Sequence, residues 1–118
     1  KNSYADSTAI YELDVQNVKS SDLLIAVIDG VEIDSGVACE IGIATALNIP
    51  VIALYTDVRQ HGTYNDDKLY ALFKDATENQ FMYRNLFVVG AVKSNGKIVN
   101  TLEDLITEVQ NFVTERAD

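Results

Sequence analysis

Runs of apolar residues separated by short polar segments divide the chain into alternating strands and helices. Two apolar runs rich in β-branched residues, over residues 23–29 and 51–56, have the length and composition of strands buried in a parallel sheet. Between them, small and apolar residues over 36–47 predict a helix that is apolar on every side and therefore buried. Strand, helix and strand make one βαβ unit, so the pattern predicts an α/β fold.

Helical periodicity precedes this unit. Ile10, Asp14 and Val18 follow one another at intervals of four residues, which predicts a helix capped by Asp6 or Ser7 and continuing to about residue 19. Asp14 therefore lies within an apolar stripe. An acid at that position either reaches solvent at the edge of the stripe or serves a function, and periodicity does not decide between the two.

The C-terminal third continues the alternation. Residues 97–100 are predicted to form the last strand, and Thr101 with Asp104 forms a capping box for an amphipathic helix that runs from residue 102 to the end of the chain. Residues 86–92 are ambiguous, because their valines favour a strand while their length suits a helix equally well.

A polar loop is predicted over residues 57–66, followed by a short helix over 66–74. The loop contains Arg59 and His61 and lies at the carboxyl edge of the sheet, where it either covers a substrate or serves as a solvated connection. His61 is the only histidine, and no cysteine lies near it, so no metal site is expected.

Composition and charge exclude several classes of function. The chain has 118 residues, 47% of them hydrophobic, which is enough for one globular domain over residues 1–118. A formal net charge of −9 opposes binding to nucleic-acid polymers and to anionic membranes. No apolar run is long enough to span a membrane and no export signal opens the chain, so we expect a cytoplasmic protein. Cys39 is the only cysteine, and its apolar neighbours favour an inert, buried thiol.

The most informative stretch is residues 26–44, where the first apolar strand is followed by an acidic loop and the apolar helix. The helix opens with Asp34-Ser35-Gly36 at the carboxyl edge of the sheet, where ligands of α/β proteins usually bind. Asp34 or Ser35 can cap the helix, and Gly36 allows another group to approach the backbone closely. Glu40 is the one charged residue in this helix, so its carboxylate must be hydrogen-bonded or functional to offset desolvation.

These residues resemble a known family. Asp-Ser-Gly-Val-Ala-Cys-Glu-Ile-Gly, over residues 34–42, is similar to the D-x-G-x-A-x-E-x-G signature of the nucleoside 2-deoxyribosyltransferases. Leu13-Asp14-Val15-Gln16-Asn17 and Asn85-Leu86-Phe87 stand where members of that family carry related motifs, with Phe87 in place of a methionine. The resemblance implies a doubly wound, flavodoxin-like parallel sheet with helices on both faces, and it favours a helix over residues 86–92.

That fold has five strands in the order 2-1-3-4-5, whereas only three are predicted here. The resemblance begins at the helix before the third strand of the family. We therefore expect that the first strands of the family domain are missing from this chain.

The resemblance also implies a chemical role for two carboxylates. Glu40 would be the nucleophile that attacks C1′ of the sugar, and its place near a helix N-terminus favours the charged form. Asp14 would meet the nucleobase and pass a proton to or from its nitrogen. Such a pair would transfer 2-deoxyribose between bases by a retaining double displacement through a deoxyribosyl-glutamate intermediate.

Four further residues are implied as substrate-binding: Asp34, Gly36, Asn85 and Phe87. Asp34 would bind the deoxyribose hydroxyls, and Asn85 would hold the 5′ end of the sugar from a neighbouring subunit, with Phe87 packed beside it. The expected partners are therefore deoxynucleosides, free nucleobases and further copies of this chain in a homo-oligomer, with no cofactor.

Two other functions remain open. An N-glycosidase that hydrolyses 2′-deoxynucleoside 5′-monophosphates would share the fold and the nucleophile. It would have to place a phosphate beside Asp34, and two like charges about 4 Å apart cost about 4 kcal/mol at an effective dielectric constant of 20, so free nucleosides are favoured. The other alternative is a nucleotide-binding α/β module without catalysis, because acids at a sheet edge also serve as helix caps.

Overall fold

The computed structural model describes residues 5–56 and 84–117. Within these ranges three parallel strands form an open sheet in the order β1-β2-β3: β1 (Leu24–Val27), β2 (Val51–Leu54) and β3 (Gly96–Val99). Ile25 of β1 pairs with Ile52 of β2, and Ala53 of β2 pairs with Ile98 of β3. The four described helices are α1 (Ser7–Lys19), α2 (Ser35–Ala46), α4 (Leu86–Asn95) and α5 (Leu102–Ala117).

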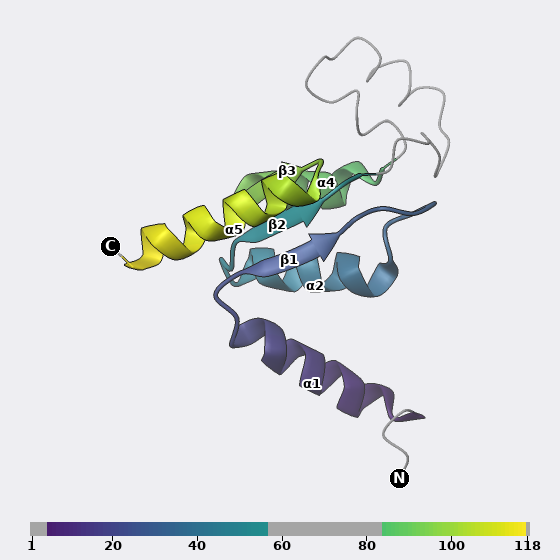
Figure 1. Cartoon of the computed structure of the whole chain (residues 1–118). Coiled ribbons are helices and arrows are strands. Elements are labelled where there is room, and N and C mark those ends of the chain that lie inside the picture. The colour runs from purple at the N-terminus through teal and green to yellow at the C-terminus, as the bar shows by residue number, and fades with distance from the viewer. Residues whose placement is uncertain (1–4, 57–83, 118) are drawn as a thin grey trace.

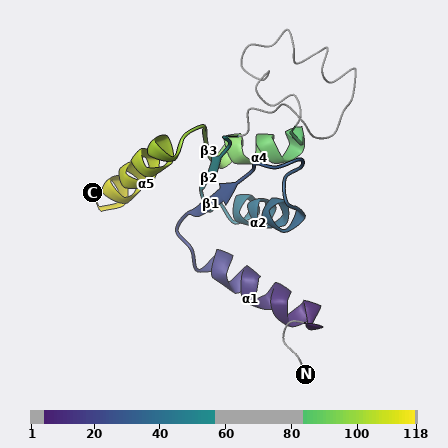
Figure 2. The same ribbon diagram turned by 45° about the vertical axis from the view of Figure 1, so that its right-hand side comes forward.

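The helices cover both faces of the sheet. Helices α2 and α4 pack beside each other on one face, and α5 packs on the other face over β2 and β3 (Figures 1 and 2). Helix α1 contacts α2 (Figure 1). This arrangement confirms the predicted α/β class with helices on both faces, and it confirms that the ambiguous segment at residues 86–92 is a helix.

The hydrophobic core lies between the sheet and the α2–α4 layer. Its fully buried side chains include Ile28 after β1, Ile41 on α2, Val51 on β2, and Val89 and Val92 on α4. On the opposite face of β1, Ile25 and Val27 remain about half exposed, at 48% and 52%. The core thus positions α2 and α4 against the sheet and so determines where the loops at the carboxyl edge begin.

Helix α2 departs from the prediction that it is buried on every side. Ile41 and Ala44 are fully buried, but Cys39 and Gly42 are exposed. The sheet covers one face of the helix, and α1 and α4 contact it beside that face, so the outer face meets solvent in the described structure. The expectation of a buried Cys39 thiol is therefore wrong, because the cysteine lies on this outer face.

Helix α1 has the predicted limits but a smaller buried surface than its periodicity indicates. Asp6 is its N-cap, and the Oδ1 atom of Asp6 accepts a hydrogen bond from the Ala9 N–H at 3.1 Å. Val15 and Val18 are buried, whereas Ile10 and Leu13 are exposed. This helix packs on α2 rather than on the sheet, so most of its apolar stripe has no described surface to contact.

The end of α2 is set by a Schellman motif around Asn48. Asn48 has φ of 59°, its N–H donates to the Thr45 carbonyl at 3.2 Å, and the Ile49 N–H donates to the Ala44 carbonyl at 2.8 Å. Asparagine adopts this left-handed conformation more readily than most residues, and the two bonds satisfy carbonyls that the helix end leaves open. The predicted helix end at Asn48 is confirmed.

The remaining predictions are only partly tested by the structure. At the start of α5, the Thr101 hydroxyl accepts a hydrogen bond from the Asp104 N–H at 3.0 Å, which is one of the two bonds of the predicted capping box. None of the helices described here is long and apolar enough to cross a bilayer. The predicted loop at 57–66 and helix at 66–74 lie outside the described residues.

Candidate functional site

The candidate site lies at the carboxyl edge of the sheet, where a hydrogen-bonded pair joins the ends of two strands. Asp29 follows β1 and Thr56 follows β2. The two carboxylate oxygens of Asp29 accept hydrogen bonds from the N–H and the hydroxyl of Thr56, each at 2.6 Å. Asp29 therefore holds the start of the loop after β2 against the start of the loop after β1. Sequence analysis did not single out this pair, although an acid that ends one strand and a hydroxyl that ends the next could have indicated it.

The loop after β1 leads into α2 through Asp34. Gly30 has φ of 103°, a conformation that side chains disfavour, which allows the loop to turn at that position. Asp34 is the N-cap of α2, and its Oδ2 atom accepts a hydrogen bond from the Val37 N–H at 3.1 Å. Among the described residues this is the only hydrogen bond of the exposed carboxylate, and the Oδ1 atom accepts none from them.

Glu40 lies in the second turn of α2 and is half-buried. Gly36 precedes it by four residues, so the two share one face of the helix. Helical side chains lean toward the N-terminus of their helix, so the Glu40 side chain leans toward the turn that contains Gly36. A Cβ atom at Gly36 would lie 3.2 Å from Asp34 Oδ2. The first two turns of α2 therefore place Gly36 beside Asp34 and on the same face of the helix as Glu40.

Asp14 is exposed on α1, the helix that contacts α2. In Figure 1 the N-terminal ends of α1 and α2 both lie toward the carboxyl end of the strands, the end to which the β1 arrow points. No hydrogen bond joins the side chains of Asp14, Asp34 and Glu40, all of which lie in the described ranges. The structure thus places Asp14 exposed on a helix that contacts α2, the helix that carries Glu40.

Asn85 and Phe87 open α4, the helix that packs beside α2. Asn85 is the N-cap, and its Oδ1 atom accepts hydrogen bonds from the N–H groups of Phe87 at 3.0 Å and Val88 at 3.2 Å. Because the oxygen is engaged, the side-chain NH₂ group is what Asn85 offers to a ligand. Phe87 is 87% exposed, so none of the described elements covers this aromatic ring.

Sequence reasoning missed Arg84, which is 1% exposed and lies at the same edge. Its Nη1 atom donates to the Ile28 carbonyl at 3.2 Å, and its Nη2 atom donates to the Val31 carbonyl at 3.4 Å. The guanidinium carbon lies 5.4 Å from the centre of the Tyr55 ring. An arginine just before a helix N-cap has no periodic signal that would reveal such burial.

A shallow hollow of about 120 Å³ lies at the opposite, amino end of the strands, between β2, β3 and α5. An ion pair between Lys97 and Glu108, with a nitrogen–oxygen distance of 2.9 Å, borders it. The hydrogen bond that Lys97 donates to the Glu108 carboxylate raises the pKa of Lys97 above its ordinary value. None of the candidate residues lines this hollow. In the described part of the chain, no group of three or more His, Cys, Asp or Glu residues is arranged to hold a metal ion.

Comparison with known proteins shows to which family the chain belongs. Residues 1–102 match the sequence model of the nucleoside 2-deoxyribosyltransferase family. The match extends over most of the 118 residues, so the chain belongs to this family.

A solved structure supports the same fold. The crystal structure of a conserved protein from Enterococcus faecalis V583 is 54% identical to this chain, with a TM-score of 0.72. The similarity covers 94% of this chain and 69% of that one. No curated protein matches the chain.

Proposed function

We propose that this protein transfers 2-deoxyribose between nucleobases and that Glu40 carries the sugar between the two half-reactions. The observation that carries the proposal is the family match together with the arrangement of α2, in which a lone carboxylate follows a capping aspartate and a glycine at the carboxyl edge. That edge is where α/β proteins bind small molecules.

In the first half-reaction a carboxylate oxygen of Glu40 attacks C1′ of a deoxynucleoside. The bond between C1′ and the base nitrogen breaks, its electron pair remains with the base, and Asp14 supplies the proton that makes the base a neutral leaving group. The product is a deoxyribosyl ester of Glu40. In the second half-reaction a nitrogen of another base attacks C1′, the ester bond breaks, and Asp14 takes up the proton that the new base loses.

The remaining candidate residues would hold the sugar. The Oδ1 atom of Asp34 can accept hydrogen bonds from deoxyribose hydroxyls, and the NH₂ group of Asn85 can donate to the 5′ oxygen. Deoxynucleosides and free bases are thus the substrates that we propose. None of these steps requires a metal or an organic cofactor.

The stereochemical course tests this proposal. Two displacements at C1′ invert the configuration twice, so incubation with 2′-deoxyinosine and adenine is expected to give β-2′-deoxyadenosine, with ping-pong kinetics and slow hydrolysis when no acceptor base is present. Proton NMR reports the anomeric configuration, and chromatography reports the products. An α-anomeric product would contradict the double displacement. Release of free sugar without exchange would indicate a hydrolase, and absence of turnover would indicate a binding module.

The substitution Gly36→Ala is expected to lower base exchange by about 10 to 100-fold without unfolding the protein. The added methyl group occupies the surface beside Glu40 and presses on Asp34 Oδ2, and a small displacement of reacting groups costs rates of this order. The one close atom lies at the end of the exposed Asp34 side chain, which can move, so the protein should stay folded. The measurements are kcat and the thermal midpoint.

Gly90→Ala is the control, because Gly90 is an exposed glycine of helix α4, outside the signature over residues 34–42, and its added methyl group would have nothing within 4 Å. It should leave exchange unchanged. Equal losses of activity in both variants would show that the region around Gly36 has no special role.

We also infer that the active form is a homo-oligomer in which a neighbouring copy covers the start of α4. Phe87 is 87% exposed and Leu86 is 38% exposed, directly beside Asn85. Burying a phenylalanine side chain contributes about 1.5–3 kcal/mol, which favours association at this point. Sedimentation at assay concentration is expected to give a species larger than the monomer, and an active monomer would contradict the inference.

A further inference from the structure

We propose that Arg84 is a positioning residue that fastens the loop between β1 and α2 to the start of α4, and so fixes Glu40 relative to Asn85. This inference rests on the proposed function, since it assigns Arg84 a part in the same reaction. It concerns a side chain that the family motifs around Asp34, Glu40 and Asn85 do not include.

The contacts of Arg84 join elements that are far apart in the sequence. Through Nη1 it holds the Ile28 carbonyl at the carboxyl end of β1, and through Nη2 it holds the Val31 carbonyl in the middle of the loop. The guanidinium also lies against the ring of Tyr55, the residue that follows β2. The next residue in the chain is Asn85, the N-cap of α4. The Arg84 side chain therefore contacts the residues that follow β1 and β2, and Arg84 itself directly precedes the N-cap of α4.

The chemical type of the side chain matters at this position. Moving a guanidinium out of water is costly, and a well-packed apolar side chain of similar volume often gives equal or greater stability. Burial of Arg84 is thus not the simplest way to fill this space. What the planar fork supplies, and an apolar or ammonium side chain does not, is simultaneous donation to two carbonyls in a fixed geometry.

The two carbonyls lie on either side of the turn at Gly30. Gly30 has φ of 103°, and glycine gives an unfolded chain more conformational freedom than any other residue, so ordering this turn has a high entropic cost. Three residues after Val31 the chain reaches Asp34, which begins α2. Fixing Ile28 and Val31 therefore fixes the direction in which α2 starts and, through the rigid helix, the position of Glu40.

The test compares Arg84→Met and Arg84→Lys with a control at the other end of the sheet. Met removes both donors and the charge while keeping much of the volume, and Lys keeps the charge but not the fork. Asn95→Ala is the control, because Asn95 donates one hydrogen bond to the Ile49 carbonyl at 2.7 Å before the amino end of β2, away from the site. Each variant is assayed well below its thermal midpoint, with kcat and KM for 2′-deoxyinosine and adenine, and hydrogen exchange is followed in residues 29–34.

We expect both Arg84 variants to lower kcat and kcat/KM together, by about 100-fold for Met and less for Lys, because small misplacements of reacting groups cost rates of this order. Amide exchange in residues 29–34 should become faster in both variants. Asn95→Ala should lower the thermal midpoint but leave kcat and this exchange unchanged.

Wild-type kcat in a folded Arg84→Met protein would overturn the proposal. If Arg84→Met does not fold, wild-type kcat and loop exchange in Arg84→Lys would overturn it. An equal loss of kcat in Asn95→Ala would show that the Arg84 variants act only through a general loss of stability, and this would also overturn the proposal. Should the wild-type protein not exchange bases, the proposed function fails, and hydrogen exchange of residues 29–34 then decides independently whether Arg84 holds the loop.

Discussion

Glu40→Ala is expected to abolish base exchange, with a loss of about 1,000-fold or more, because removal of a nucleophile usually costs several orders of magnitude. The fold should survive. Glu40 makes no hydrogen bond or ion pair within the described residues, and a half-buried carboxylate on a largely apolar helix is partly desolvated without compensation from them. The measurements are kcat for exchange between 2′-deoxyuridine and adenine, and the urea midpoint. Retention of more than about a tenth of wild-type turnover would exclude Glu40 as the nucleophile.

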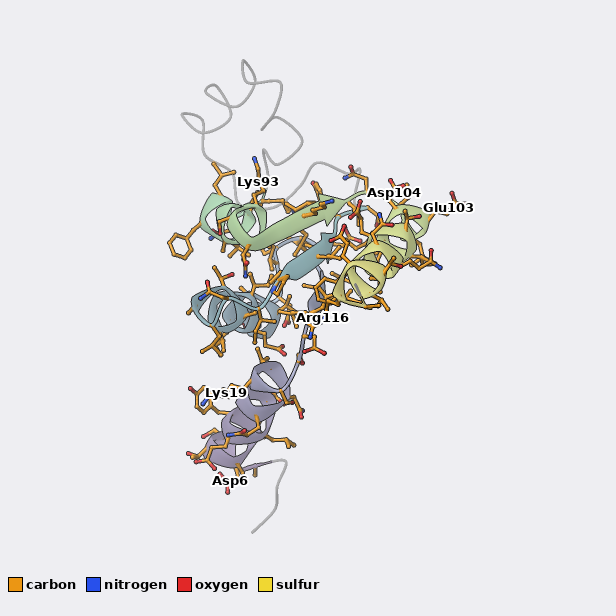
Figure 3. The ribbon with its side chains drawn as sticks, turned by 90° about the vertical axis from the view of Figure 1, so that its left-hand side faces the viewer. Asp6, Lys19, Lys93, Glu103, Asp104 and Arg116 are labelled. Atoms are coloured by element: carbon orange, nitrogen blue, oxygen red, sulfur yellow. The ribbon has the colours of Figure 1, made fainter. Side chains whose placement is uncertain are left out.

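Glu103→Ala is the control for loss of one negative charge. Figure 3 shows Glu103 on α5, on the opposite face of the sheet from α2, and it is exposed. Its removal should leave exchange unchanged. Trapping with a 2-fluoro sugar analogue gives a second, direct readout, since mass spectrometry should find the label on the peptide that contains Glu40. A label on any other peptide would contradict the assignment.

Gly96→Ala is expected to destabilise the protein by about 3 kcal/mol or more, at or above the upper end of the usual cost of overpacking. A Cβ atom at Gly96 would lie 1.6 Å from the Val51 carbonyl oxygen and 2.6 Å from the Val51 carbonyl carbon. Both atoms belong to the backbone of β2, the central strand, so no side chain can move aside to make room. Relief requires that β3 move away from β2 where the two strands begin to pair.

The free energy of unfolding in urea measures this effect, and Gly90→Ala is the matched control. Gly90 is an exposed glycine within α4, and a Cβ atom there would have nothing within 4 Å. Alanine at this position should leave stability unchanged or raise it by about 0.5–1 kcal/mol. Similar midpoints for the two variants would show that β2 and β3 tolerate a side chain between them.

The sequence by itself determined the secondary structure of the described residues and the place of the α2 motif. Helix limits such as Asp6 and Asn48 depend on side chains and backbone groups no more than five positions away, so local patterns were sufficient. The segment at residues 86–92 was the exception, because its apolar composition suits either element and only the family resemblance favoured a helix. The places of Asp34, Gly36 and Glu40 were predictable for the same local reason, since Asp34 caps α2 and the other two lie in its first two turns.

Only the tertiary structure decided which surfaces are covered and which distant residues meet. The outer face of α2 is exposed although its sequence is apolar, because composition does not say on how many sides a helix has neighbours. The contact of Asp29 with Thr56 spans 27 positions, and that of Arg84 with Ile28 spans 56. Periodicity describes the faces of single elements, whereas such contacts follow from the order of the strands in the sheet and from how the loops pack at its edge. For that reason the motif residues could be found in the sequence, while the buried arginine that holds their loop could not.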